Sequence, residues 1–239
     1  VKVVHQRNQG AGESRNKGMS VSTGKYLFFV DSDDCLDGNN AVSTLVQCAE
    51  ENAADIVVGN FRKLTENGCS DVNCHHLEVG EYTETVDFRF KGFFQCGHLG
   101  FNWGKCYKKE FLEQYNLRCA NYPFSEDKAM NMCCCVCRPI YAFVDESVYL
   151  YRVNEESASY QYRDNLMDIW IANGMNLSDF VKANNIQRDY KDVMDFHIFL
   201  GLFTIIQQEI QAGNTKISSM TKQLKKYGNN KFVRECLKD

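Results

Sequence analysis

Three aspartates lie within four positions of one another, immediately after an unbroken apolar segment. Asp31, Asp33 and Asp34 follow residues 26–30, whose sequence is YLFFV, and Gly24 lies just before that segment. A short apolar segment with such boundaries is typical of a strand buried on both faces of a sheet. Ligands of open α/β sheets bind beyond the carboxyl ends of such strands. The three carboxylates are therefore predicted to lie at a binding site.

Three neighbouring carboxylates repel one another unless a cation lies among them. Mg²⁺ and Mn²⁺ take oxygen ligands and usually share their coordination shell with phosphate groups. The spacing of Asp31 and Asp33 favours a divalent metal site if the chain turns after Val30, with Asp34 as a further ligand or support. Solvated acids at the end of a strand are the alternative interpretation, which the pattern alone leaves open.

A second acidic pair, Glu126 and Asp127, follows Ser125 in the sequence FSEDK. Ser125 is a favourable N-cap, and carboxylates in a first helical turn interact well with the helix dipole, so a helix start alone accounts for the pair. The segment NWGKCYKK holds Trp103 and Lys105. A core tryptophan and a surface lysine are the simplest interpretation of these two.

Apolar periodicity predicts an α/β unit followed by a helical region, with a boundary near residue 160. Strands are expected at residues 1–4, 26–30, 55–59, 140–144 and 148–151, with helices at 13–22, 39–52, 110–115 and 125–136. Helices are expected beyond the boundary at residues 165–184, 190–211 and 216–227. Alternating strands and helices indicate a layered α/β fold, and the first two strands should be parallel.

Composition excludes several classes of function. The 239 residues carry a formal net charge of -4, which gives no basic surface for nucleic acid. No signal-peptide pattern begins the sequence, and the longest apolar segment, residues 193–206, is interrupted by Asp195 and His197 before it reaches the ~20 residues that span a bilayer. We therefore expect a cytoplasmic protein.

The 12 cysteines are expected to be reduced thiols, because no export signal accompanies them. Four of them lie between positions 133 and 137 on a predicted helix, where only Cys133 and Cys137 share a face, so four metal ligands do not converge there. The cysteines and histidines of residues 69–76 match no established zinc spacing. Small buried thiols are the default interpretation of these cysteines.

Taken in order, these motifs resemble the family 2 glycosyltransferases, GT-A-fold enzymes of bacterial polysaccharide assembly. The resemblance covers about residues 1–160 and rests on the segments Asn8–Gly10, Ser14–Gly18, Gly24–Tyr26, Phe29–Asp34, Asn102–Tyr107, Ser125–Asp127 and Tyr149–Arg152. It implies a GT-A-like, mostly parallel sheet flanked by helices in a domain of residues 1–160. Residues 161–239 would form a C-terminal helical region.

The resemblance implies transfer of a single sugar from a nucleoside-diphosphate sugar, with a UDP-sugar favoured, to a saccharide or lipid-linked acceptor. Asp31, Asp33 and Asp34 would hold a divalent metal ion, Mg²⁺ or Mn²⁺, which offsets the charge of the leaving diphosphate. Asp31 would also lie near the ribose, and Arg15 near the nucleotide, although a surface arginine is an equal alternative.

The resemblance also assigns the acceptor side of the reaction. Asp127 would take the proton of the attacking hydroxyl, with Glu126 beside it, and one displacement would invert the anomeric carbon. Trp103 would stack on the acceptor sugar, and Lys105 would lie near phosphate. The Gln-x-x-Arg-Trp motif of processive synthases does not follow Asp127, which favours a single addition.

Other interpretations stay open. Family members begin with further strands that carry much of the nucleotide-base pocket, so we expect an N-terminally truncated fragment, and an inactive fragment or binding module is one alternative. A haloacid-dehalogenase-like phosphatase also places Asp-x-Asp after a strand, but Cys35 and Leu36 replace its small Gly-Thr-like turn. The apolar helices of the C-terminal region either dock on the α/β unit or make peripheral contact with the inner face of a membrane.

Overall fold

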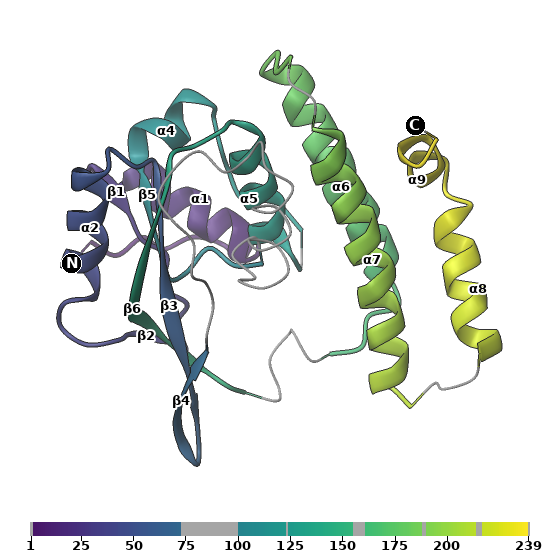
Figure 1. Ribbon diagram of the computed structural model, residues 1–239, viewed down its shortest axis with the longest axis horizontal. Coiled ribbons are helices and arrows are strands. Elements are labelled where there is room, and N and C mark those ends of the chain that lie inside the picture. The colour runs from purple at the N-terminus through teal and green to yellow at the C-terminus, as the bar shows by residue number, and fades with distance from the viewer. Residues whose placement is uncertain are drawn as a thin grey trace. The chain divides into compact units, whose positions relative to one another are not determined.

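The computed structural model describes residues 2–72, 100–122, 124–154, 161–187, 190–213 and 217–238. The chain divides into two compact units, residues 1–154 and 155–239. Unit 1 combines a sheet with helices, and the described part of unit 2 is helical (Figure 1). The α/β class and the C-terminal helices are thereby confirmed.

One mixed sheet forms the centre of unit 1. Within the described ranges it has six strands, namely β1 (Tyr26–Leu27), β2 (Cys35–Leu36), β3 (Ile56–Thr65), β4 (Gly68–Val72), β5 (Lys105–Lys108) and β6 (Tyr141–Arg152). The strand order is β1-β5-β3-β6-β2, with β4 paired to β3. The central pair β3 and β6 is parallel, whereas the other named pairs are antiparallel. The expectation of a mostly parallel sheet was therefore wrong, because β4 folds back on β3 and the short strands join in the antiparallel sense.

Helices lie on both sides of this sheet. Helix α2 (Ala41–Glu51) buries Leu45 and Ala49 in a core cluster with Val57 of β3 and Ala142 of β6. Helices α1 (Ala11–Val21) and α5 (Glu126–Val136) lie on the opposite side from α2 (Figure 1). A short helix, α4 (Lys109–Gln114), follows β5 directly. These helices confirm four of the sequence predictions to within two residues at most boundaries.

Two predicted strands differ from the structure. Residues 2–10 form no strand, and Val3 and Val4 are 69% and 40% exposed, so the predicted parallel pair with residues 26–30 is absent from the described chain. In the predicted strand of residues 26–30 only Leu27 is buried, and Val30 is 47% exposed. The prediction of a strand buried on both faces was wrong because apolar sequence alone does not determine whether a sheet covers the segment.

The described part of unit 2 consists of α6 (Leu166–Ala183), α7 (Lys191–Gln211), α8 (Ile217–Gly228) and α9 (Lys231–Cys236). The first three confirm the predicted helices closely. Helix α7 is long and apolar enough to span a membrane, although a core helix meets the same criteria. Its Ile198 and Ile205 are buried inside the unit, and Gly201 permits a close approach, since a Cβ there would lie 2.7 Å from the hydroxyl of Tyr227.

The described cysteines are free thiols, and those at positions 133, 134, 135 and 137 are buried. Burial raises the pKa of Cys133 and Cys134 above the ordinary range of a thiol. In the part of the chain that the structure describes, no group of three or more His, Cys, Asp or Glu side chains is arranged to hold a metal ion. Residues 74–76, which belong to the cysteine and histidine group of residues 69–76, lie outside the described residues.

Candidate functional site

Arg15 joins the two acidic segments that the sequence singled out. Its Nη2 lies 2.7 Å from Asp31 Oδ1, and its Nη1 lies 2.5 Å from Glu126 Oε1. The side chains of Arg15, Asp31 and Glu126 are 17%, 31% and 11% exposed. The guanidinium of Arg15 therefore brings Asp31, which follows β1 in the chain, and Glu126, in the first turn of α5, to a common site.

The charge of Arg15 is stabilised by this arrangement. Burial alone would lower the pKa of Arg15, but the hydrogen bonds and negative charges of Asp31 and Glu126 outweigh burial and raise that pKa above its ordinary value. A planar guanidinium suits this place because it donates to two carboxylates at once in a fixed geometry. Arg15 is thus a fixed cation between the two acidic segments rather than a surface arginine.

Helix α1 is attached to the chain that leads into α5. A Cβ at Gly12 would lie 2.4 Å from the carbonyl oxygen of Ala120, so only glycine permits this approach without a shift. The side-chain amide of Asn16 donates to the Cys119 carbonyl and accepts from the Cys119 N–H, both at 2.9 Å. These contacts determine where Arg15 projects.

Residues 31–34, which we call the acidic loop, turn back at once after Val30. The N–H of Asp34 donates to the carbonyl of Asp31 at 3.1 Å. Asp34 accepts from the hydroxyl of Tyr149 at 2.9 Å and from the N–H of Arg152 at 2.8 Å, so each of its oxygens has a partner on β6. Burial, followed by the proximity of Asp33 and Asp31, raises the pKa of Asp34 despite these donors.

Asp33 and Asp31 are the residues of the acidic loop that fit a divalent cation. Asp33 is exposed, and Asp31 engages Arg15 through Oδ1. Two carboxylates, without a third His, Cys, Asp or Glu grouped with them among the described residues, suit an ion that completes its shell with phosphate and water. Asp34 faces β6, so it supports the loop.

Asp127 has the electrostatic properties of a general base. Its carboxylate accepts a hydrogen bond from the N–H of Lys128 at 2.7 Å. Burial and then the charge of Glu126 raise the pKa of Asp127 to about 6, while Arg15 and Lys105 oppose the rise. A base with a pKa just below neutral is mostly ionised at pH 7 and still accepts protons well.

The residue before this acidic pair has an uncommon backbone conformation. Ser125 has φ 67° and ψ 23°, in the left-handed region, and its side chain makes no capping hydrogen bond to α5. The predicted N-cap position is correct, but the predicted side-chain cap is wrong. A non-glycine residue in this region costs on the order of 1 kcal/mol. Backbone strain therefore lies directly beside the candidate base.

Trp103 and Lys105 both lie in the interior. Trp103 is 8% exposed, and its ring stacks with Phe101 at 3.8 Å and with Tyr149 at 4.5 Å between centroids. Lys105 is 1% exposed, and its Nζ donates to the carbonyl of Phe101. Protein atoms surround the indole and the ammonium group, and the acceptor contacts of both residues stay a prediction. The surface lysine of the alternative interpretation was wrong, because Lys105 is buried.

A buried polar network links this interior lysine to the helix that carries Asp127. Asn131 of α5 donates to the Phe101 carbonyl at 3.1 Å and to Asn102 Oδ1 at 2.7 Å, and it also donates to the Asp127 carbonyl at 3.0 Å. Sequence reasoning missed Asn131. The available signal was an amide side chain among the apolar residues that follow the charged first turn of α5.

Lys105→Met should raise the stability of the protein at pH 7, and the gain should shrink as the pH approaches 10. Burial lowers the pKa of Lys105 to about 7, below the unfolded value. Between pH 7 and the pKa of an unfolded lysine, about 10.4, the unfolded state binds more protons than the folded state. The free energy of unfolding of the wild type therefore rises with pH in this range. We expect a gain of about 2 kcal/mol at pH 7 in urea unfolding. The Phe101 carbonyl keeps a hydrogen-bond donor in this variant, because Asn131 also donates to it. A gain in stability that stays constant with pH would contradict the prediction.

The half-exposed Lys108 on the same strand provides the matched control. Its side chain is 31% exposed and lies 3.8 Å from Asp55. Lys108→Met removes an equal charge without removing a buried ammonium group, so its effect on the free energy of unfolding should be small at both pH values.

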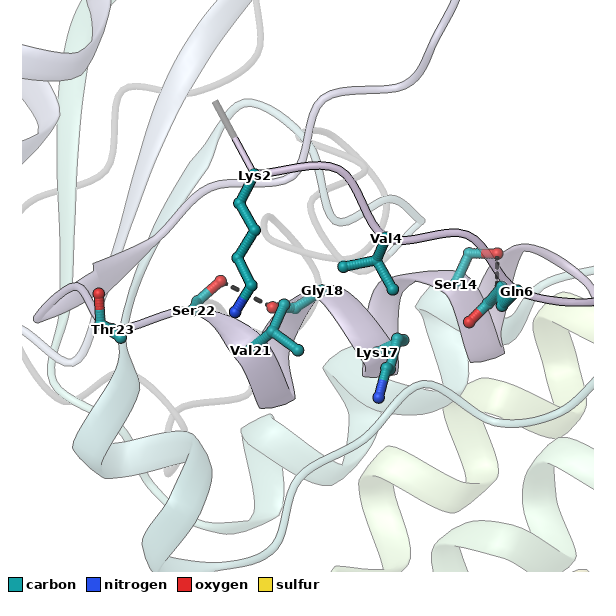
Figure 2. A pocket seen from close by; sticks show the side chains of 9 residues that line it. All are labelled: Lys2, Val4, Gln6, Ser14, Lys17, Gly18, Val21, Ser22 and Thr23. Atoms are coloured by element: carbon teal, nitrogen blue, oxygen red, sulfur yellow. Dashed lines mark hydrogen bonds between the residues drawn. The ribbon is translucent and has the colours of Figure 1, made fainter.

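A cavity of about 480 Å³ lies along another face of α1 and is shown in Figure 2. Its lining residues are Lys2, Val4, Gln6, Ser14, Lys17, Gly18, Val21, Ser22 and Thr23. None of them is a predicted site residue. The N-terminal segment lies over the helix here, and Gln6 donates to Ser14 at 2.9 Å. This cavity is therefore distinct from the site around Arg15.

A comparison with protein families identifies the first part of the chain. Residues 1–115 match the model of the family described as glycosyl transferase family 2. Residues 1–115 belong to glycosyl transferase family 2. The matched part of this family 2 domain includes Arg15 and the acidic loop and ends before α5, which carries Asp127.

Relatives extend the similarity of the family 2 domain further along the chain. EpsH of Bacillus subtilis is 25% identical over 205 residues, which cover 83% of this chain and 58% of EpsH. Glycosyltransferase GlyG of Streptococcus pneumoniae is 28% identical over 220 residues, which cover 82% of this chain and 71% of GlyG. The chain thus spans between half and three quarters of the length of these two relatives.

Solved structures establish the fold. The crystal structure of residues 1–349 of S. aureus TarS in complex with UDP-GlcNAc has a TM-score of 0.57 and 13% sequence identity, over 72% of this chain and 48% of that one. At this identity the similarity concerns the fold alone. It confirms the GT-A type of fold that the motifs implied.

Proposed function

We propose that this protein transfers a single sugar from a nucleoside-diphosphate sugar to the hydroxyl of a saccharide or lipid-linked acceptor, with a divalent cation and with inversion. The observation that carries the proposal is the Arg15 bridge, because it brings the acidic loop and the first turn of α5 to one site. The glycosyltransferase GlyG and the TarS complex with UDP-GlcNAc support a nucleotide-sugar donor, with UDP favoured.

The chemistry divides between the two acidic segments. Asp33 and Asp31 would hold the cation, which supplies positive charge for the leaving diphosphate when it is bound. Asp127 takes the proton of the acceptor hydroxyl as that oxygen bonds to the anomeric carbon and the bond from this carbon to the diphosphate oxygen breaks. Attack on the face opposite the leaving group inverts the anomeric carbon.

Arg15 and Glu126 prepare this site. Glu126 anchors the guanidinium, and the guanidinium in turn orients Asp31. Since the charge on Glu126 also raises the pKa of Asp127, the same ion pair contributes to the strength of the base. The four side chains act as one electrostatic unit.

The proposal is tested by release of UDP from UDP-hexoses in the presence of Mn²⁺ and an oligosaccharide acceptor. The wild type should release UDP, chelation with EDTA should stop the reaction, and Asp33→Asn should lower the rate about 100-fold or more. The exposed Asp71 on β4 is the matched control, and Asp71→Asn should leave the rate unchanged. Equal rates for wild type and Asp33→Asn would overturn the metal assignment.

Thermal stabilisation separates an enzyme from a module that binds no nucleotide. A ligand specific for the native state raises the unfolding temperature. UDP together with Mn²⁺ should raise it for the wild type, and the effect should be lost in Asp33→Asn. The proposed function is overturned if the wild type is not stabilised by UDP with Mn²⁺ and also releases no UDP.

A further inference from the structure

The acidic loop is attached to a single strand through four hydrogen bonds. The hydroxyl of Tyr149 on β6 accepts from the N–H of Asp31 at 3.1 Å and donates to Asp34 Oδ2 at 2.9 Å. The N–H of Arg152 donates to Asp34 Oδ1 at 2.8 Å, and its Nε donates to the carbonyl of Asp33 at 3.0 Å. Every acid of the loop therefore has a backbone or side-chain attachment to β6.

Tyr149 is itself held firmly. The residue is fully buried, and its ring is nearly parallel to that of Trp103, with centroids 4.5 Å apart and an interplanar angle of 10°. Its backbone lies opposite Phe61 of β3 and Leu36 of β2 in the sheet. The position of the hydroxyl is thus determined by the centre of the fold rather than by the loop.

The hydroxyl of Tyr149 acts both as a hydrogen-bond acceptor and as a hydrogen-bond donor. It accepts from a main-chain N–H and donates to a carboxylate, and the carboxylate that it binds is withdrawn from the cation. Asp34 is turned to the sheet, and Asp33, which is exposed, and Asp31 remain at the open side of the loop. Two carboxylates fixed in this way leave room in the shell of an ion for phosphate oxygens.

We propose that Tyr149 is a positioning residue for the cation site, which fixes the acidic loop so that Asp33 and Asp31 address one divalent ion. The inference rests on the proposed function, and it assigns to the sheet a role that the Asp-x-Asp pattern does not contain. Tyr149→Phe keeps the ring and its stacking but releases the Asp31 N–H and one oxygen of Asp34. The loop must then be ordered by the ion itself, and Asp34 repels the other two acids from a less defined position.

Binding of Mn²⁺ measures this directly, without sugar transfer. Free Mn²⁺ is counted by electron paramagnetic resonance while the full chain is titrated, with and without UDP. Loss of a group that orients metal ligands weakens affinity by about 10–100-fold, which is the expectation for Tyr149→Phe. Asp33→Asn should abolish binding. Arg152→Met removes the contact to Asp33 from the exposed side of the strand and should weaken binding a few-fold.

Tyr227 in unit 2 provides the matched control. It is also fully buried, and its hydroxyl donates to the carbonyl of Ile198 at 3.4 Å. Tyr227→Phe makes the same chemical change in the other compact unit and should leave Mn²⁺ affinity unaltered. Saturating Mn²⁺ should restore the kcat of Tyr149→Phe, which a general structural defect would not permit.

The outcomes separate the inference from the proposed function. Wild-type affinity in both Tyr149→Phe and Arg152→Met, with binding lost in Asp33→Asn, overturns the inference and leaves the function standing. If Tyr149→Phe does not fold, unchanged affinity in Arg152→Met is sufficient to overturn the inference. A wild type that binds no Mn²⁺ with or without UDP overturns both.

Discussion

Asp127→Asn should lower the rate of sugar transfer by about 10³-fold while making the protein more stable at pH 7.5. The variant cannot take the proton of the acceptor. Burial and Glu126 raise the pKa of Asp127 to about 6, so its ionised form opposes folding. The amide removes this cost, and we expect the free energy of unfolding to rise by about 1–3 kcal/mol.

The pH dependence of this gain follows from the direction of the shift. The folded state holds the proton of Asp127 more tightly than the unfolded state does, so wild-type stability is lost as the pH rises through about 6. Urea unfolding of wild type and Asp127→Asn should therefore agree below pH 4 and differ fully above pH 7. The wild-type rate should fall on the acidic side of about pH 6.

The exposed Glu113 on α4 serves as the control for this prediction. Its side chain is 58% exposed and pairs with Lys109 at 3.3 Å. Glu113→Gln should change neither the rate nor the stability appreciably, because exposed ion pairs contribute little. Full transfer activity in Asp127→Asn would remove this residue from the mechanism, and loss of stability would contradict the account of its burial.

Arg15→Met should be among the most destabilising single changes in unit 1 and should also abolish transfer. The substitution leaves Glu126 largely buried without a cation and leaves Asp31 beside the other acids of its loop. Removing one partner of a buried ion pair costs about 3–5 kcal/mol, and the partial exposure of Asp31 favours the lower end. Chemical denaturation of the purified variant measures the loss.

A double-mutant cycle isolates the coupling between Arg15 and Glu126. Arg15→Met combined with Glu126→Gln should cost less than the sum of the two single changes by about 1–2 kcal/mol, because the isolated charge is then absent. The exposed Lys17 on the same helix is the matched control, and Lys17→Met should be additive with Glu126→Gln. Strict additivity of both pairs would show that the ion pair does not exist in solution.

Sequence periodicity predicted the helices well and the sheet less well. Long apolar patterns such as those of α6 and α7 fix a helix locally, since each residue contacts others only a turn away. Strands depend on partners that are distant in the sequence. The valines of residues 2–4 favour a strand, yet the segment pairs with no strand in the described structure, and only two of the five apolar residues after Gly24 are assigned to β1.

The candidate site shows the same division. The acidic patterns around Asp31 and Glu126 were visible in the sequence, but Arg15 and Glu126 are 111 positions apart, and only folding brings them together. Polar residues within strands were misjudged, because period-two alternation does not reveal which face a core covers. Lys105 was expected at the surface but is buried. Tyr149 was not expected to contact the acidic loop, yet its hydroxyl binds Asp31 and Asp34.

The Arg15 bridge has a consequence for the order in which ligands arrive. The guanidinium is already compensated by Asp31 and Glu126, so it does not neutralise the remaining acids, Asp33, Asp34 and Asp127, around it. An anionic nucleotide-sugar donor that approached without a divalent cation would be repelled by the negative charge of these carboxylates. We therefore expect the nucleotide to enter as an already neutralised complex, and association at low ionic strength to slow when the divalent cation is scarce.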